Sequence, residues 1–90
     1  MKNRNIIYSK TFDLAVESLG GYRNVDIAID TIIDALRRNP FGFLKVENDF
    51  FSFRYAITKS IDHMPPLIVT FLILSNGDVT LEHVEEHIEY

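Results

Sequence analysis

Arg54 and Lys45 are the side chains of this sequence best suited to bind an anion. Arg54 lies in the middle of an expected strand, between the small residues Ser52 and Ala56, so we expect its guanidinium to project from an open stretch of sheet. Lys45 falls on a shorter strand expected beside it. An arginine fork binds phosphate oxygens bidentately, and a neighbouring ammonium adds a second positive charge. The two residues therefore predict a phosphate-binding surface.

The same arginine has a plainer interpretation. Glu47, Glu82 and Glu85 are carboxylates that can pair with it across the sheet. An exposed ion pair of this kind contributes under ~1 kcal/mol. A structure in which Glu82 or Glu85 neutralises Arg54 favours an interaction domain, whereas a concave patch without acids favours phosphate chemistry.

The string from His83 to His87 matches the H-x-x-E-H pattern of one group of zinc peptidases. Those enzymes bind zinc from a helix, but here the string continues a strand. At ~3.3 Å per residue the two imidazoles lie ~13 Å apart, too far to share one zinc ion. We therefore predict no metal site and no cofactor. The acids near the end of the chain are interpreted as a solvated strand end: Glu82, Glu85, Glu86 and Glu89.

The composition describes one ordinary domain over residues 1–90, without repeats or linkers. The chain has 13 Asp and Glu, 9 Lys and Arg, and 47% hydrophobic residues. It has no cysteine, which excludes disulfides, thiolate metal sites and a cysteine nucleophile. The net charge of −4 argues against a generally basic nucleic-acid binder but allows a local basic groove. The longest apolar run, residues 67–74, is far short of the ~20 residues of a membrane helix, so we expect a cytoplasmic protein.

The first half of the chain predicts a strand and two helices. Residues 5–8 form a short apolar strand that ends at Ser9, a helix cap. Apolar residues at helical spacing follow, and Gly20-Gly21 ends this helix. Asn24 is expected to cap the second helix and Asn39-Pro40 to end it, so that the helices form an antiparallel hairpin. The apolar face of the second helix is the clearest pattern in the sequence: Val25, Ala28, Ile29, Ile32, Ile33 and Leu36.

The second half changes to a period of two. Residues 43–46 predict a short strand, and large apolar residues alternate with smaller or polar ones through the next: Phe51, Phe53, Tyr55 and Ile57. We expect that alternating set to face the core and Arg54 to face away from it. Residues 59–66 follow as a polar loop, in which His63 could be a general base but is interpreted first as an exposed polar side chain. Residues 67–74 predict a central strand buried on both faces.

A last hairpin completes the sheet. Asn76-Gly77 is typical of a two-residue turn, and residues 79–84 form the return strand. The rings of Phe41, Phe43 and Phe50 exceed what one core face holds, so we expect some of them to form a partner surface. The order predicts an α+β fold, in which the N-terminal strand and the helical hairpin pack on one face of a twisted antiparallel sheet of four to five strands.

This order resembles the RelE/ParE superfamily of toxins from bacterial type II toxin-antitoxin systems, over nearly the whole chain. The matching pieces are Tyr8 to Phe12 at the first strand-to-helix step, Asn39-Pro40 after the second helix, Phe53-Arg54-Tyr55 in the third strand and the apolar hairpin from Leu67 to Leu81. The terminal segment, Val84 to Tyr90, is similar to the family's last segment, which commonly carries a basic residue and ends near a tyrosine.

The resemblance implies a metal-independent endoribonuclease that cuts messenger RNA in the ribosomal decoding site, or a gyrase-poisoning toxin on the same scaffold. It also implies a cognate antitoxin as protein partner. In the ribonuclease branch, Lys and Arg neutralise charge on the scissile phosphate, and a Tyr, His or Glu moves the 2′-hydroxyl proton. By position, Arg54 and Lys45 match the phosphate-facing cations, and His87 and Tyr90 match the terminal basic residue and tyrosine.

Two functions stay open on the sequence. Ribosome-dependent members of the family tend to be basic, whereas this chain is acidic and carries Glu85 and Glu86 in its last strand. The first hypothesis is a toxin-like component of a toxin-antitoxin pair that uses Arg54 and Lys45 on phosphate, with His87 or Tyr90 as acid or base. The second is a noncatalytic interaction module of the same fold, which binds a protein partner through exposed aromatic rings or a sheet edge.

Overall fold

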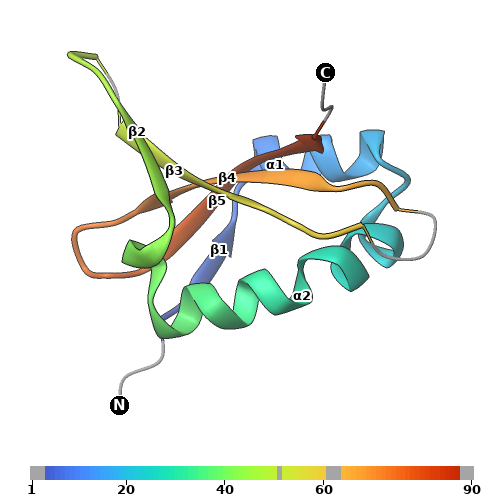
Figure 1. Cartoon of the computed structure of the whole chain (residues 1–90), viewed down its shortest axis with the longest axis horizontal. Helices are drawn as coiled ribbons and strands as arrows, with labels where there is room; N and C mark the ends of the chain where they lie inside the picture. Colours follow the sequence, from blue (N-terminus) through green and yellow to red (C-terminus); the bar gives the residue numbers. More distant parts are fainter. Residues whose placement is uncertain (1–3, 51, 61–63, 88–90) are drawn as a thin grey trace.

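The computed structural model describes residues 4–50, 52–60 and 64–87 (Figure 1). Along the chain the elements are β1 (Ile6–Tyr8), α1 (Lys10–Ser18), α2 (Tyr22–Arg38), the 3-10 helix η1 (Pro40–Gly42), β2 (Leu44–Glu47), β3 (Ser52–Ile57), β4 (Leu67–Ile73) and β5 (Val79–Glu86). The expected order of one strand, two helices and four strands is confirmed, with η1 as an addition after α2. The fold is therefore α+β.

The strands form one five-stranded sheet in the order β1-β5-β4-β3-β2. Strands β2 to β5 pair antiparallel, as expected. Strand β1 pairs parallel to β5, with Tyr8 opposite Leu81, so the expectation of a wholly antiparallel sheet is wrong at this edge. Parallel neighbours need a long crossover rather than a tight turn, and here most of the chain lies between the two strands.

Local sequence sets the ends of α1. Ser9 caps the helix as predicted, because its side chain accepts a hydrogen bond from the Phe12 backbone N–H at 3.1 Å. After the helix, Gly20 and Gly21 take φ values of 99° and 96°. Residues other than glycine rarely adopt this backbone conformation. The two glycines therefore allow the chain to turn back between the helices.

The N-cap of helix α2 lies three residues before the expected one. The helix starts at Tyr22 with Gly21 as N-cap, so the expectation that Asn24 caps it is wrong. The Asn24 side-chain amide instead donates to the Gly20 carbonyl at 3.5 Å. The expected end at Asn39-Pro40 is confirmed, since α2 stops at Arg38. No helix in the described part of the chain combines the length and apolar character needed to cross a membrane.

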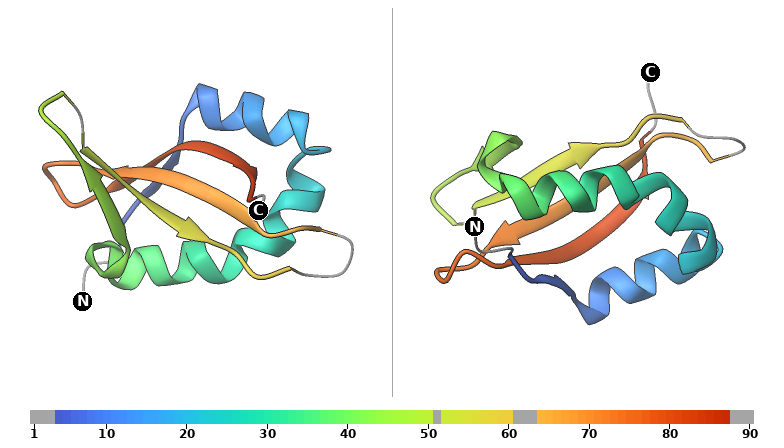
Figure 2. Two further views of the ribbon diagram at one scale, coloured as in Figure 1. Left: turned by 45° about the horizontal axis from the view of Figure 1, so that its top comes forward. Right: turned by 90° about the horizontal axis from the view of Figure 1, so that it is seen from below.

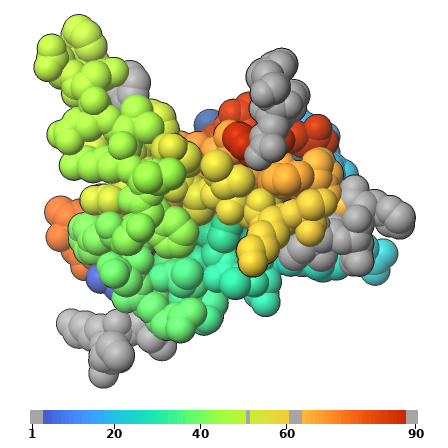
Figure 3. All heavy atoms as spheres, in the orientation of Figure 1, coloured from blue at the N-terminus to red at the C-terminus, as the bar shows by residue number. Residues whose placement is uncertain are grey.

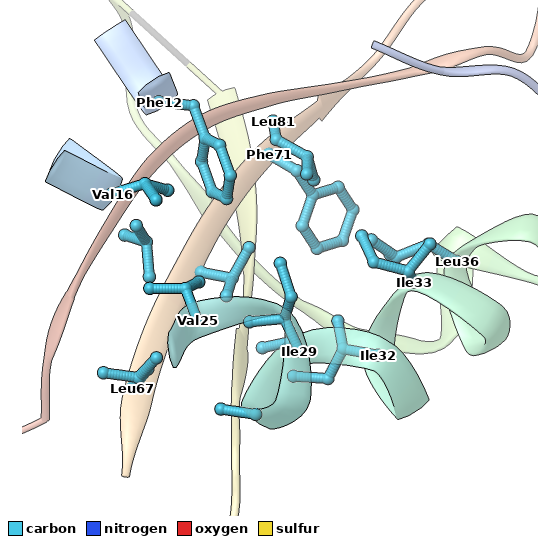
Figure 4. Close-up of a cluster of buried hydrophobic side chains, with 14 of the residues drawn as sticks. Phe12, Val16, Val25, Ile29, Ile32, Ile33, Leu36, Leu67, Phe71 and Leu81 are labelled. Carbon is cyan, nitrogen blue, oxygen red and sulfur yellow. The ribbon is translucent and has the colours of Figure 1, made fainter. Parts of the chain in front are cut away.

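Both helices bury one face against the same side of the sheet, and they run back along it in opposite directions (Figure 2). All six apolar residues predicted for α2 are buried, and α1 adds Phe12 and Val16 (Figure 4). Fully burying a side chain of this size contributes roughly 1.5–3 kcal/mol. Strands β3, β4 and β5 contribute to the same core, with the alternation of β5 interrupted by a register shift against β4: Ala56, Leu67, Val69, Phe71, Val79, Leu81 and Val84.

The face of β3 that meets the core is opposite to the expected one. Ala56 is 4% exposed and lies opposite buried Val69, whereas Ile57 is 45% exposed. Phe53 and Tyr55 alternate with Ala56 and therefore lie on the side of Ile57. Alternation shows that two faces of a strand differ, but it does not say which face a helix covers. Here the wide apolar face of α2 packs over the smaller side chain.

Central strand β4 shows the same asymmetry, so the expectation that it is buried on both faces is wrong. Residues on the helix side are fully buried, at positions Leu67, Val69 and Phe71. Residues on the other side are half-exposed, at positions Ile68, Thr70 and Leu72. A strand is buried on both faces only when other elements cover both faces of its sheet. Here both helices lie on the same face of the sheet. Phe51, which was expected in the core, lies outside the described residues.

The final hairpin is confirmed, but its turn is longer than expected. The Leu74 N–H donates to the Asp78 carbonyl at 2.8 Å, which leaves residues 75–77 in the loop. Gly77 takes a φ of 93°, as a loop of this length with a glycine at its end requires. The Asp78 N–H also donates to the Asn76 side chain at 3.0 Å, which fixes the loop locally.

Two isoleucines of α2 test whether this core stabilises the fold. Ile29 is 1% exposed and Ile27 is 60% exposed. We expect Ile29→Ala to lower the free energy of unfolding by roughly 2–5 kcal/mol, because it removes buried methylene groups and leaves a cavity. Ile27→Ala is the matched control and should change it by less than about 0.5 kcal/mol. Urea unfolding measures both, and equal losses would contradict the packing of α2.

Candidate functional site

The register of β2 and β3 places Lys45 directly opposite Arg54. Residues opposite each other in an antiparallel pair have Cβ atoms about 5 Å apart and share one face. The prediction that these two cations share a sheet face is therefore confirmed. Together they line a shallow hollow of about 350 Å³, here called the basic hollow, which consists of Phe41, Lys45, Ser52, Phe53, Arg54, Leu72, Ile73 and Leu74.

Arg54 lies on the helix side of the sheet, opposite buried Phe71, rather than on the open side where it was expected. Its Nη1 donates to the carbonyls of Phe41 at 3.2 Å and Phe43 at 2.8 Å. Its guanidinium carbon also lies 5.5 Å from the centre of the Phe41 ring. These contacts of Arg54 hold η1 and the residue that follows it against β3. Both bonds use one terminal nitrogen of a group with five N–H donors, so donors remain for an anion.

The carboxylates considered as partners of Arg54 lie elsewhere. Glu85 pairs with Ile68 on the face away from the helices, and Arg54 forms no ion pair with any described carboxylate. Glu47 pairs instead with Lys45, at 3.1 Å between Oε2 and Nζ, and both side chains are exposed. Exposed pairs contribute little and exchange readily with water or ligand. The residues that line the basic hollow include no acid.

A further cation that the sequence analysis did not identify lies close to this site. Nη1 of Arg4 donates to the carbonyls of Arg37 at 3.2 Å and Arg38 at 3.1 Å, at the C-terminal end of α2. Its guanidinium carbon lies 5.9 Å from the centre of the Phe41 ring. The ring of Phe41, 56% exposed, therefore contacts two guanidiniums. In the sequence, Arg4 is an arginine before the first strand, fifty positions from Arg54, and no pattern indicates that the two lie close together.

The structure does not bring His87 to Arg54. The His87 N–H donates to the Pro66 carbonyl at 2.8 Å, at the start of β4, whereas Arg54 lies opposite Phe71 near its end. Phe71 is five positions after Pro66 along the strand, which corresponds to a distance of roughly 16 Å. Tyr90 and His63 lie outside the described residues.

The histidine string of β5 is a strand, as predicted. β5 extends to Glu86, and His83 Nε2 lies 3.8 Å from Glu85 Oε2, two residues along the same face. In the described part of the chain, no group of three or more His, Cys, Asp or Glu side chains is arranged to hold a metal ion.

The opposite face of the sheet carries no helix and is largely apolar. Over β2, β3 and β4 this open face consists of Leu44, Val46, Phe53, Tyr55, Ile57, Ile68, Thr70 and Leu72, and β5 adds the polar residues His83 and Glu85 beside them. Leu44 is 62% exposed, and Phe50, 93% exposed, lies at the tip of the β2–β3 hairpin, which projects from the body of the protein (Figure 3). The expectation that some of the phenylalanines lie outside the core is confirmed for Phe41 and Phe50.

Tyr8 and Tyr22 form a second group of titratable side chains, beside the acidic face of α2. Their rings lie 5.8 Å apart, and the Tyr22 hydroxyl donates to the Asp13 carboxylate. Burial, and then the hydrogen bond to Asp13, raises the pKa of Tyr22 well above its usual range. Burial and then the negative charge of Asp26 raise the pKa of Tyr8. Both phenols therefore stay protonated near neutral pH and cannot act as bases there.

The arrangement offers charge and an aromatic ring at one place, without a proton-transfer group. Among the described residues that line the basic hollow there is no histidine, tyrosine or carboxylate. Comparisons of the chain with protein-family models, with curated proteins and with solved structures gave no match. Lys45 and Arg54, with the ring of Phe41 beside them, are the groups of the basic hollow that are suited to hold an anion.

The two cations of the basic hollow should differ in their effect on stability. We expect Arg54→Met to lower the free energy of unfolding by roughly 1–2 kcal/mol, because it leaves the Phe41 and Phe43 carbonyls without their charged donor. Lys45→Met removes only an exposed ion pair and should cost less than about 0.5 kcal/mol. Urea unfolding of the two variants makes the comparison. Equal losses would show that Arg54 does not fasten η1.

The raised pKa of Tyr22 predicts a loss of stability in alkali. Above pH ~10 an unfolded tyrosine releases its proton while folded Tyr22 retains it, so the unfolded state binds fewer protons and the free energy of unfolding falls as the pH rises. We expect this fall to be shallower in Tyr22→Phe than in the wild type. Urea unfolding between pH 8 and pH 11 measures it, with Tyr55→Phe, on the open face, as control. A slope unchanged by Tyr22→Phe would contradict the prediction.

Proposed function

We propose that this chain is a toxin-like component of a toxin-antitoxin pair of the RelE/ParE kind, and that its basic hollow binds a phosphate of RNA. The observation that carries the proposal is the juxtaposition of Lys45 and Arg54 at a hollow whose lining holds no carboxylate. Two adjacent cations and a planar donor fork are the groups that bind a phosphate diester most tightly. The α+β order of the elements, with both helices on one face, is compatible with that family.

In this proposal each residue of the hollow has a separate task. Arg54 has one nitrogen committed to η1, which holds the guanidinium in place so that its remaining donors meet the phosphate in a fixed geometry. Lys45 adds a mobile charge and exchanges its exposed contact with Glu47 for the phosphate. The exposed ring of Phe41 offers a surface on which a neighbouring base can stack.

The basic hollow accounts for binding and charge neutralisation but not for proton transfer. Because no described lining residue is a histidine, tyrosine or carboxylate, a cleavage reaction would need its acid and base from the RNA, the ribosome or Tyr90. The proposal therefore predicts RNA binding by the isolated protein, and cleavage only where another component supplies the missing group.

A second function is favoured by a different observation. The open face exposes a continuous set of apolar side chains on β2, β3 and β4, which is unusual for a surface that meets only water. A noncatalytic interaction module of the same fold would use this face for a protein partner. In that case, substitutions in the basic hollow should leave partner binding intact.

RNA binding can be measured directly by fluorescence anisotropy with a labelled single-stranded RNA. We expect Arg54→Ala and Lys45→Ala each to weaken binding by roughly 10-fold or more, because each removes a charged phosphate contact. Each should also reduce the slope of log K against log salt by about one. Arg23→Ala is the matched control, since Arg23 is exposed in the first turn of α2, at the end of the helix away from η1.

Primer extension on messenger RNA from cells that express the protein tests the toxin assignment itself. Cleavage or growth arrest that is lost in Lys45→Ala and kept in Arg23→Ala supports it. The proposal would be overturned, in favour of the interaction module, if Arg54→Ala, Lys45→Ala and Arg23→Ala all bound RNA with the same affinity and the wild type caused neither cleavage nor growth arrest.

A further inference from the structure

Among the residues that the structure describes, strand β2 is an edge strand with no partner strand on its outer side. It lies at the end of the strand order, and all four of its residues are exposed. An edge strand presents a row of unpaired backbone N–H and C=O groups, which can pair with another strand. Proteins often block such edges with proline, with a bulge or with charged side chains. Strand β2, Leu-Lys-Val-Glu, has neither proline nor bulge in its pairing with β3, and its two charges are of opposite sign, so they can pair with those of a second copy. The other edge strand, β1, has only three residues and is followed by α1, so it offers a shorter edge for pairing than β2 does.

We propose that two copies of this chain pair through β2 in an antiparallel manner, with Val46 of one copy opposite Val46 of the other. A two-fold axis perpendicular to the sheet relates the copies, so the open faces of both lie on one side. The two sheets then form one continuous sheet of twice the width. The inference goes beyond the proposed function and does not depend on it.

The charges of β2 select this register from the alternatives. Lys45 and Glu47 lie on the helix side of the strand, with Val46 between them on the open face. With Val46 at the two-fold axis, Lys45 of each copy lies opposite Glu47 of the other, which gives two reciprocal ion pairs. A register centred on Lys45 would oppose two ammonium groups, and one centred on Glu47 would oppose two carboxylates. Opposite charges across a strand pair attract, and like charges repel.

The apolar residues of β2 agree with the same arrangement. In this register the two Val46 side chains, each 36% exposed in the single chain, meet at the axis on the open face and cover one another. Leu44, which flanks Val46 on this face, comes to lie beside Asn48 of the other copy. The exposed Lys45–Glu47 contact within one chain shows that these side chains already lie side by side, so pairing requires only that they change partners.

A cysteine substitution tests the register, because the chain contains no cysteine of its own. Opposite residues in an antiparallel pair have Cα atoms about 4.5–5.5 Å apart, which fits a disulfide. We therefore expect Val46→Cys to form a disulfide-linked dimer under mild oxidation. Leu44→Cys is the matched control: the two substituted positions would lie roughly 13 Å apart and should stay unlinked. Equal linking of both variants would overturn the register.

Sedimentation equilibrium tests the association itself and the charges behind it. The wild type should shift with concentration from 10.4 kDa towards twice that mass. Glu47→Lys should weaken dimerisation by roughly 10-fold or more, and the double variant Lys45→Glu, Glu47→Lys should restore it, because the swap recovers both ion pairs. Circular dichroism confirms that each variant is folded. A wild type that stays at the mass of one chain up to its solubility limit would overturn the proposal, as would a double variant as weak as the single one.

Discussion

The burial of the apolar face of α2 against the sheet is the constraint on which the rest of this structure depends. Six residues of that helix pack over the inner side of β4 and β5, together with Phe12 and Val16 of α1. Because both helices lie on this side, strands β3, β4 and β5 each have a covered face and an open face. The position of each strand residue relative to the core follows from that choice, and so does the place of each functional side chain.

Arg54 shows how the constraint produces a site. On the helix side of β3, Arg54 follows Ala56 towards the end of the strand where α2 has ended and η1 covers the sheet. The charged side chain of Arg54 therefore lies at the rim of the core and not in its interior. It bonds two carbonyls of the chain that follows α2, and it comes to lie beside Lys45 and the ring of Phe41. Arg54 is thereby kept apart from Glu85, which lies on the other face, while the acid beside this cluster, Glu47, pairs with Lys45.

The two sides of the sheet have different chemistry for the same reason. The helix side provides a basic rim suited to an anion, and the open face provides apolar side chains suited to another protein surface. The edge strand β2 belongs to both, because Lys45 and Glu47 point to one side and Leu44 and Val46 to the other. A single strand of alternating residues therefore presents charged side chains on one face and apolar side chains on the other, and Lys45 is shared between the proposed phosphate contact and the proposed ion pair with the second copy.

The sequence by itself determined the helices, the strands and their order, because periodicity, Ser9, the glycine pair and Asn39-Pro40 act on near neighbours in the chain. It also offered Lys45 and Arg54 as two cations that could share one sheet face, and the register of β2 and β3 places them there. Only the tertiary structure decided which face of β3 the helices cover, that β1 runs parallel to β5, and that Arg4 reaches Phe41. Each of these depends on contacts between distant segments, and a strand's alternation is the same whichever of its faces is buried.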